Sequence, residues 1–260
     1  MRDIEGSIAW VTGAGSGVGE AAAIALAKAG ATVVLTGRRP EPLAAVARAI
    51  EAAGGAGGPK PWVEAGDLAR SADVMAIAGR IEARFGRLDI LVANAGLNIN
   101  ERSWRQLKPA GIDDLVDANL KSAFYCVSAV LPIMRAQGGG QIINVASMAG
   151  RVVGLMLGPG YVAAKHGMVA MSHSINMEEC VNGIRSCVIC PGEIATPILD
   201  KRPVPVPKEE RDRMLQATDV AAMILHVARQ PAHVCINEVQ MTPTHNRGYL
   251  AAMRAPHVKV

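Results

Sequence analysis

The apolar positions of this chain form short runs that alternate with longer segments of helical pattern. The short runs are typical of buried strands. They are Ser7–Val11, Ala31–Leu35, Trp62–Ala65, Leu88–Ala93, Gln141–Val145, Ile184–Ile189 and Val234–Met241. The segments between them that fit a helix are Gly19–Ala29, Pro42–Ala53, Ala72–Phe85, Ile112–Ala136, Tyr161–Cys180 and Asp219–Ala228, the last with Thr218 as its N-cap.

This alternation predicts an α/β fold. It implies a mostly parallel, seven-stranded sheet with helices on both faces, a single doubly wound Rossmann-type domain over residues 1–260. One region stands apart, because Gly192–Met214 is charged and contains Pro197, Pro203, Pro205 and Pro207. It follows the carboxyl end of a strand, where such sheets bind ligands. It is either a cover over the substrate, at about residues 192–216, or a plain surface loop.

Composition narrows the class of protein. The chain has 260 residues and is 50% hydrophobic, which is enough for a full core. The net charge of +4 is not gathered into a basic patch with stacking aromatic residues, so we expect no nucleic acid partner. No apolar stretch reaches the roughly 18 residues of a membrane span, and no signal-peptide pattern precedes the first strand. We therefore expect a cytoplasmic protein without membrane contact.

The cysteines do not form an obvious functional set. There are 5, an odd number that argues against a disulfide framework. Cys187 and Cys190 have the C-x-x-C spacing of redox and metal pairs, but they lie in a predicted strand. Side chains three residues apart on a strand face opposite sides, so we interpret both as core residues. No cluster of His, Cys or Asp has metal-ligand spacing, and we expect no metal.

The turn from the first strand into the first helix is rich in glycine. From Thr12 to Gly19 it reads T-G-x-x-x-G-x-G rather than G-x-G-x-x-G. Glycines let the backbone approach a pyrophosphate, and the helix N-terminus offers N–H groups and a favourable dipole. The alternative is a glycine-rich surface turn. The predicted dinucleotide contacts are Gly13, Gly15, Ser16, Gly17, Val18 and Gly19.

The end of the second strand bears on the choice of cofactor. An acidic residue there would bind the ribose 2′-hydroxyl of NAD, but the chain has Thr36-Gly37-Arg38-Arg39. A guanidinium pairs well with a phosphate, so Arg38, with Arg39 as a second candidate, predicts the 2′-phosphate of NADP(H). The alternative is two solvated arginines and NAD(H).

A candidate proton-transfer group lies further along the chain. Tyr161 and Lys165 are four residues apart and share one helix face, and Ser147 follows a strand. A tyrosine is a poor base at neutral pH, but a nearby ammonium stabilises its phenolate. The tyrosine can then exchange the proton of a substrate hydroxyl while a hydride moves to or from a nicotinamide. Ser147 can hold the substrate oxygen.

Together these motifs resemble the short-chain dehydrogenase/reductase family, in its short single-domain branch. The likeness covers nearly the whole chain. The matching positions are Thr12–Gly19, Asn94-Ala95-Gly96 (the family's N-A-G), Asn119 (its helix asparagine), Ser147, Tyr161 and Lys165 (its serine and Y-x-x-x-K), and Pro191-Gly192 with Thr196 (its P-G-x-x-x-T).

The resemblance implies further roles. Asn119 would hold a water in a proton relay through Lys165, which would also bind the nicotinamide ribose. Asp67 would bind the adenine, Asn94 would lie beside the ribose, and Ile194 and Thr196 would contact the carboxamide. The other implied cofactor contacts are Leu68, Ala95, Gly96, Pro191 and Gly192. The family's usual homodimer or homotetramer, formed through the helices at residues 112–136 and 161–180, is implied as well.

The chain departs from the family in several places. The first asparagine of the family's N-N-A-G is Ala93 here, and the segment after Thr196 is short and rich in proline. Ser147 and Tyr161 are separated by one residue more than is usual, and the loop Val152–Gly160 must absorb this. The end Cys235–Arg247 lacks the glycine-rich finish of many relatives and looks more like relatives that act on small hydroxy acids.

We therefore predict an oxidoreductase that transfers a hydride between NADP(H) and a small alcohol or carbonyl compound. The alternative within this class is an NAD-dependent alcohol or hydroxy-acid dehydrogenase. An alternative from another class is a non-catalytic dinucleotide-binding module.

Overall fold

The computed structural model describes residues 1–54, 58, 60–201 and 206–253. Its main sheet has 7 strands, all parallel, in the order β3-β2-β1-β4-β5-β6-β9. The predicted fold class is therefore confirmed. The strands are β1 (Ile8–Thr12), β2 (Thr32–Gly37), β3 (Trp62–Ala65), β4 (Ile90–Ala93), β5 (Gly140–Val145), β6 (Ile184–Pro191) and β9 (Glu238–Met241).

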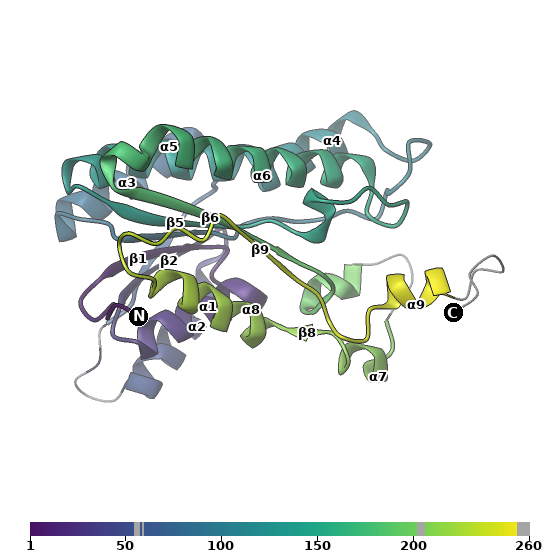
Figure 1. The fold of residues 1–260 in the computed structure, drawn as a ribbon, viewed down its shortest axis with the longest axis horizontal. Coiled ribbons are helices and arrows are strands. Elements are labelled where there is room, and N and C mark those ends of the chain that lie inside the picture. The colour runs from purple at the N-terminus through teal and green to yellow at the C-terminus, as the bar shows by residue number, and fades with distance from the viewer. Residues whose placement is uncertain (55–57, 59, 202–205, 254–260) are drawn as a thin grey trace.

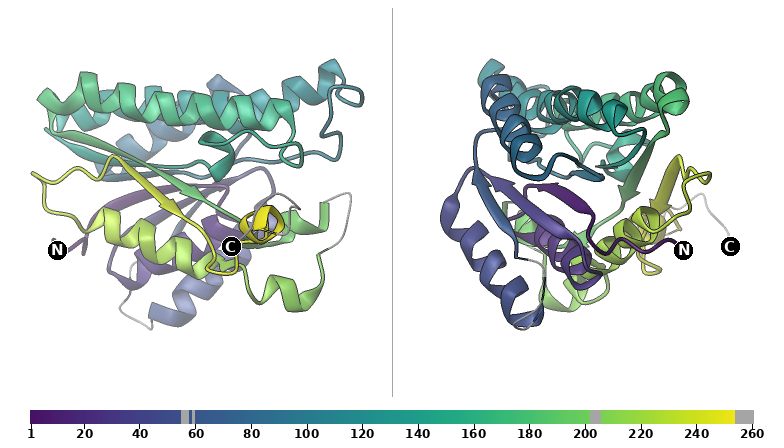
Figure 2. Two further views of the ribbon diagram at one scale, coloured as in Figure 1. Left: turned by 45° about the vertical axis from the view of Figure 1, so that its right-hand side comes forward. Right: turned by 90° about the vertical axis from the view of Figure 1, so that its left-hand side faces the viewer.

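Helices cover both faces of this sheet (Figures 1 and 2). One face carries α1 (Gly17–Lys28), α2 (Pro40–Gly54) and α8 (Ala217–Ala228). The other carries α3 (Ser71–Phe85), α4 (Pro109–Val116), α5 (Ser122–Ala136) and α6 (Pro159–Glu179). None of the helices in the described ranges is long and apolar enough to cross a membrane.

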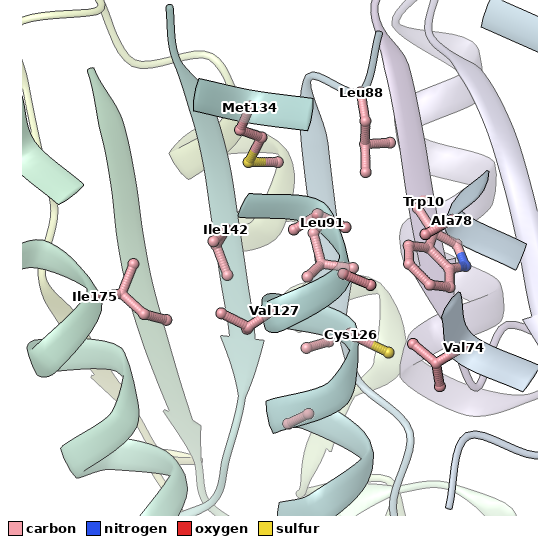
Figure 3. Close-up of a cluster of buried hydrophobic side chains, with 14 of the residues drawn as sticks. Trp10, Val74, Ala78, Leu88, Leu91, Cys126, Val127, Met134, Ile142 and Ile175 are labelled. Carbon is pink, nitrogen blue, oxygen red and sulfur yellow. The ribbon is translucent and has the colours of Figure 1, made fainter. Parts of the chain in front are cut away.

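Each face of the sheet buries its own hydrophobic core. Figure 3 shows part of the core beneath α3, α5 and α6, where Trp10, Leu91 and Ile142 from the sheet lie beside Cys126 and Met134 of α5. Trp10 is fully buried, and its indole Nε1 donates a hydrogen bond of 2.9 Å to Thr36 Oγ1. A buried indole is costly without such a partner, so this bond satisfies the largest side chain of the core.

The C-x-x-C pair behaves as its place on a strand predicts. Cys187 belongs to the core under α1 and α8, and Cys190 to the core under α3, α5 and α6. Burial raises the pKa of Cys187 to about 12 and that of Cys190 to about 11. Both thiols are therefore protonated at neutral pH and face away from each other, as expected of core residues.

Three predicted element boundaries were wrong. Thr218 does not cap α8: its N-cap is Gln216, whose backbone N–H donates to Asp219 Oδ2 at 2.7 Å. The strand predicted from Val234 begins only at Glu238, and the carbonyl of Val234 instead accepts a hydrogen bond of 2.5 Å from Arg185 Nη1.

The third concerns the long helix predicted over Ile112–Ala136. It begins earlier, at Pro109, and is interrupted by a π-helical turn, η2 (Asp117–Lys121), between α4 and α5. Such turns are uncommon in helices and are frequent at functional sites.

The proline-rich region after β6 forms several short elements. They are β7 (Ile194–Ala195), η5 (Pro197–Lys201), α7 (Lys208–Arg211) and β8 (Leu215–Gln216), and the C-terminal part adds α9 (Arg247–Met253). β7 and β8 pair in parallel as a second, 2-stranded sheet. Pro203 and Pro205 lie outside the described residues. In Figure 1, α7 and α9 lie beyond the end of β9.

Candidate active site

A cleft with a cavity volume of about 350 Å³ opens where the first four strands of the chain end. Parallel strands present their carboxyl ends at one edge, so the loops that follow them meet there. Its walls come from the turn after β1, the ends of β2 and β3, the segment after β4, and α4 with η2. The lining residues used below are Gly13, Gly15, Ser16, Arg38, Arg39, Asp67, Leu68, Ala95, Gly96 and Asp114.

Close packing, as well as access to the cleft, requires glycine in the turn after β1. Gly13 and Gly17 have positive φ angles of 62° and 59°, a conformation that side chains disfavour. A Cβ on Gly19 would lie 2.2 Å from the carbonyl oxygen of Gly13, so no larger residue fits. Gly13 and Gly15 line the cleft, whereas Val18 is buried and packs in the core beneath α1.

The first backbone N–H groups of α1 lie next to this turn. Its N-cap is Ser16, in an extended conformation, and the side chain of Ser16 makes no capping hydrogen bond. The first N–H groups of a helix have no intrahelical partner, and together with the helix dipole they favour an anion. The turn can therefore hold a phosphate.

Thr12 and Asn94 join the glycine turn to β4, a connection that sequence reasoning missed. The hydroxyl of Thr12 accepts hydrogen bonds from the backbone N–H groups of Asn94 (2.9 Å) and Ala95 (3.1 Å). Asn94 Nδ2 donates to the carbonyl of Thr12 at 3.0 Å. The side chain of Asn94 thus fixes two strand ends against each other, and Ala95 and Gly96, rather than Asn94, line the cleft. The adjacency of β1 and β4 is the signal that would have found this.

Arg38 and Arg39 lie at the mouth of the cleft, and both are exposed. Within the described part of the chain, no ion pair involves either guanidinium. On the neighbouring wall, Asp67 Oδ1 accepts a hydrogen bond of 3.1 Å from the backbone N–H of Ala69. This wall therefore offers positive charge at the end of β2 and a fixed carboxylate after β3.

Asn119 lies inside the π-helical turn and is fully buried. Its Nδ2 donates to the carbonyls of Leu97 (2.8 Å) and Leu115 (2.9 Å), and its Oδ1 accepts from the N–H of Leu97 at 3.2 Å. The Asn119 side chain thus binds the carbonyl of Leu115, four residues earlier in the helix, and connects the π-helical turn to the segment after β4.

Ser147, Tyr161 and Lys165 come from two successive elements, the 3-10 turn after β5 and the start of α6. Ser147 is the N-cap of the 3-10 turn η3 (Met148–Gly150), and its hydroxyl accepts from the N–H of Ala149 at 3.1 Å. Tyr161 and Lys165 lie in the first turns of α6, and Lys165 Nζ is 5.7 Å from the centre of the Tyr161 ring. Lys165 Nζ also donates to the carbonyl of Val145, at the end of β5, at 3.1 Å.

Gly96 connects this group to the cleft. A Cβ on Gly96 would lie 2.6 Å from Asn119 Oδ1 and 3.5 Å from Lys165 Nζ. The absence of a side chain therefore lets the lysine and the asparagine approach the backbone that lines the cleft. Glycine is required here for close approach rather than for its backbone angles.

Burial sets the ionisation of the two titratable groups. It raises the pKa of Tyr161, while a hydrogen bond with Ser147 and the positive charge of Arg102 act in the opposite direction. Burial also lowers the pKa of Lys165 to about 8. The sequence predicts that Lys165 lowers the pKa of Tyr161, but burial has the largest effect and raises it, because removal from water outweighs the nearby positive charge and the hydrogen bond.

The residues after β6 close the other side of the glycine turn. The N–H of Gly192 donates to the carbonyl of Met241 at 2.8 Å, and Leu215 donates to the carbonyl of Glu193 at 3.1 Å. Thr196 packs on the turn, because a Cβ on Gly17 would lie 3.3 Å from Thr196 Cγ2. Ile194 lies between these contacts in β7 and packs against the core beneath α1 and α8. Pro191 is the last residue of β6.

Comparison with known proteins agrees with this geometry. The protein-family model described as "short chain dehydrogenase" matches residues 7–204 of this chain. A 3beta-hydroxysteroid dehydrogenase of Mediterraneibacter gnavus is 36% identical over 201 residues, 77% of this chain and 71% of that protein. A D-beta-hydroxybutyrate dehydrogenase of Rhizobium meliloti is 34% identical over 204 residues, 78% of this chain and 76% of that protein. The crystal structure of a metagenomic short-chain oxidoreductase in complex with NADP matches with a TM-score of 0.80 at 33% identity, over 94% of this chain and 100% of that one.

The fold and the comparisons define the class of protein as an NAD(P)-dependent oxidoreductase. More specifically, the chain belongs to the short-chain dehydrogenase/reductase family, as its sequence motifs predicted.

Proposed function

We propose that this protein transfers a hydride between NADP(H) and a small alcohol or carbonyl compound, with Tyr161 as the proton-transfer group. The observation that carries the proposal is the meeting of Ser147, Tyr161 and Lys165 near Gly96, which lines the cleft beside the glycine turn. A buried acid–base group next to such a cleft is what coupled proton and hydride transfer requires.

The residues that line the cleft suit a dinucleotide. The N–H groups at the start of α1 would hold the pyrophosphate, and Asp67 and Leu68 would lie at the adenine. Lys165 would lie toward the ribose of the nicotinamide half, and Ile194 and Thr196 toward its carboxamide. Asn94 would act from behind the ribose by holding the segment of Ala95 and Gly96 that lines the cleft. When bound, the nicotinamide supplies or accepts the hydride.

The chain's own residues perform the proton transfer. In alcohol oxidation Tyr161 takes the proton from the substrate hydroxyl, and in carbonyl reduction it returns the proton to the new alkoxide oxygen. Ser147 holds that oxygen in place through its hydroxyl. Lys165 places its ammonium 5.7 Å from the phenol ring, and Asn119 would hold a water that passes the proton onward through Lys165.

Replacing Tyr161→Phe tests this assignment. The variant keeps the ring and its packing but cannot exchange a proton, so we expect kcat to fall by about 10²- to 10⁴-fold while NADPH binding is retained. Tyr125→Phe, a half-buried tyrosine on α5, is the matched control. Turnover in Tyr161→Phe close to that of the wild type would refute the assignment. Absence of turnover in the wild type over a wide alcohol and ketone panel, with intact dinucleotide binding, would favour the non-catalytic module instead.

The preference for NADP(H) rests on Arg38 and Arg39. Both are exposed at the cleft where the ribose 2′-phosphate would lie, and no acidic residue takes the position that would bind a 2′-hydroxyl. Charge-assisted hydrogen bonds contribute about 1.5–3 kcal/mol, so we expect Arg38→Gln to raise the Kd for NADPH roughly tenfold or more and to leave that for NADH unchanged. Fluorescence titration at matched ionic strength measures both. If Arg38→Gln changes the Kd for NADPH and the Kd for NADH equally and only slightly, the result favours the NAD-dependent alternative.

The relatives support a substrate with a secondary alcohol or its ketone. One is named for a 3beta-hydroxysteroid and another for D-beta-hydroxybutyrate, which differ greatly in size but share that functional group. The hydroxy-acid alternative therefore also has a named relative. We further propose a homodimer or homotetramer through α5 and α6, where Phe124 and Met177 are exposed apolar side chains.

A further inference from the structure

Arg102 links the two loops that border the candidate catalytic group. It lies in the segment between β4 and α4, and its Nε donates a hydrogen bond of 2.9 Å to the carbonyl of Ile99 in the same segment. Its Nη1 donates a hydrogen bond of 3.2 Å to the carbonyl of Met156, in the loop before α6. A second link runs beside it, from Asn98 Nδ2 to the carbonyl of Leu157 at 3.2 Å. The two loops are therefore held together by polar contacts, and Arg102 reaches both.

The contact continues to the start of the helix that carries Tyr161. Gly158 is the N-cap of α6 and has a positive φ of 85°. A Cβ built on Gly158 would lie 3.4 Å from Arg102 Cα, and the carbonyl of Gly158 accepts the first-turn hydrogen bond from Val162 at 3.1 Å. Arg102 thus packs on the residue that begins the turn in which Tyr161 lies.

Several charged or titratable groups lie around Tyr161. Lys165 is on its own helix, Ser147 comes from the 3-10 turn, and Arg102 comes from the segment after β4. α4, which packs against α6, carries Asp113 and Asp114. On the sheet side, Cys190 of β6 acts on Lys165. A positive charge near the Tyr161 hydroxyl favours its phenolate form, and Arg102 stays charged at every working pH, whereas burial lowers the pKa of Lys165 to about 8.

We propose that Arg102 is a positioning residue of this active site: it fastens the loop after β4 to the loop before α6 and, by packing on Gly158, keeps its permanent positive charge beside the first turn of α6, where Tyr161 lies. The inference rests on the proposed role of Tyr161 only for its effect on turnover. A guanidinium suits both tasks, because it stays charged at all working pH values and its planar fork can bind two carbonyls at once. Arg102 is not assigned a contact with the substrate.

The titration of Tyr161 tests the electrostatic part without any substrate. The chain has only 3 tyrosines, so tyrosinate absorbance after a stopped-flow pH jump, minus that of the same protein carrying Tyr161→Phe, isolates one phenol. We expect Arg102→Met to raise the midpoint. Arg102→Lys, which keeps the charge, stays closer to the wild type. Arg105→Met removes an exposed arginine from the same segment and serves as the control, with an unchanged midpoint.

Steady-state kinetics test the consequence for proton transfer. With 3-hydroxybutyrate or cyclohexanol and NADP+ as probes, we expect Arg102→Met to lower kcat/KM severalfold at pH 7, because a higher pKa of the phenol leaves a smaller ionised fraction at neutral pH. Raising the pH should recover most of this loss, and Arg102→Lys should recover part of it at neutral pH. A purely structural role would lower activity equally at every pH.

The outcomes separate this inference from the proposed function. A shifted phenol midpoint in Arg102→Met without turnover in any form of the protein would support the inference and refute the proposed function. If Tyr161→Phe abolishes turnover but Arg102→Met has the same phenol midpoint and pH profile as the wild type, the proposed function is supported and the inference about Arg102 is refuted. If Arg102→Met does not fold, as judged by circular dichroism, Arg102→Gln replaces it as the uncharged variant, and a phenol midpoint in Arg102→Gln equal to that of the wild type overturns the inference.

Discussion

The glycine turn after β1 and the loop before α6 lie at the same edge of the sheet but differ in how their sequences are constrained. In the glycine turn, added atoms at Gly13 or Gly19 would meet backbone or side-chain atoms at 3.0 Å or less. In the loop before α6, Val153 and Leu155 are 84% and 96% exposed. Internal packing therefore restricts which residues fit in the glycine turn, but it hardly restricts the exposed positions of the loop before α6. Loops of the second kind are where proteins of one fold vary in function.

Between these two regions, the largest expected effect on stability comes from a single methyl group in the glycine turn. Gly19→Ala would place a Cβ 2.2 Å from the carbonyl oxygen of Gly13, so the backbone must move. Overpacking typically costs about 1–3 kcal/mol, and a clash with backbone lies at the upper end or beyond. We expect a loss of about 3 kcal/mol and a fall in Tm of roughly 6–12 °C.

The matched change in the other loop sharpens the comparison. At Gly154 an added Cβ would meet only Leu157, at 3.5 Å, which is ordinary contact. Gly154→Ala should therefore leave the Tm nearly unchanged. Thermal unfolding of the two variants side by side measures the difference, and similar falls in Tm would mean that the two regions are constrained alike.

The same contrast explains what the sequence could predict. The glycine turn, the Y-x-x-x-K pair and the serine are local patterns on well-defined elements, and the alternation of strands and helices fixed the sheet. Arg102 was not predicted, because its partners, Ile99 and Met156, include a residue far along the chain. Nothing in its local pattern separates it from its exposed neighbour Arg105.

The π-helical turn at Asn119 shows a second limit. The apolar pattern over residues 112–136 predicted one continuous helix, since a single π turn hardly alters the periodicity. The turn depends on the side chain of Asn119, which binds the carbonyls of Leu97 and Leu115. That contact exists only once β4 and α4 have come together, so it belongs to the tertiary structure.

Lys165 lies near both Gly96, which lines the cleft, and the ring of Tyr161 at the start of α6, and we expect its effect on stability to depend on pH. Burial lowers its pKa to about 8 from the usual 10.5. Between these values the unfolded chain binds more protons than the folded one, so stability rises with pH across this window. Without cofactor, we expect the free energy of unfolding of the wild type, relative to Lys165→Met, to increase by up to about 3 kcal/mol from pH 8 to 10.5.

Urea unfolding of both proteins at several pH values measures this difference. The comparison with Lys165→Met is needed because Cys126 and Cys187, whose pKa values burial raises to about 12, lower stability above pH 9 in both proteins alike. A difference that stays constant from pH 8 to 10.5 would mean that the ammonium of Lys165 is solvated in the folded chain.

The smallest effect on stability is expected in the loop before α6. Leu155 is 96% exposed, so Leu155→Ser removes almost no buried area, and we expect a change within about 0.5 kcal/mol. The same substitution at Leu43, which is fully buried and lines the cofactor cleft, should cost about 2–5 kcal/mol. If the exposed apolar side chains of the loop serve an apolar substrate, Leu155→Ser raises KM for the more apolar members of an alcohol panel and leaves the Kd for NADPH unchanged. If Leu155→Ser lowers stability or weakens NADPH binding, the Leu155 side chain contributes to the packing of the protein rather than to substrate binding.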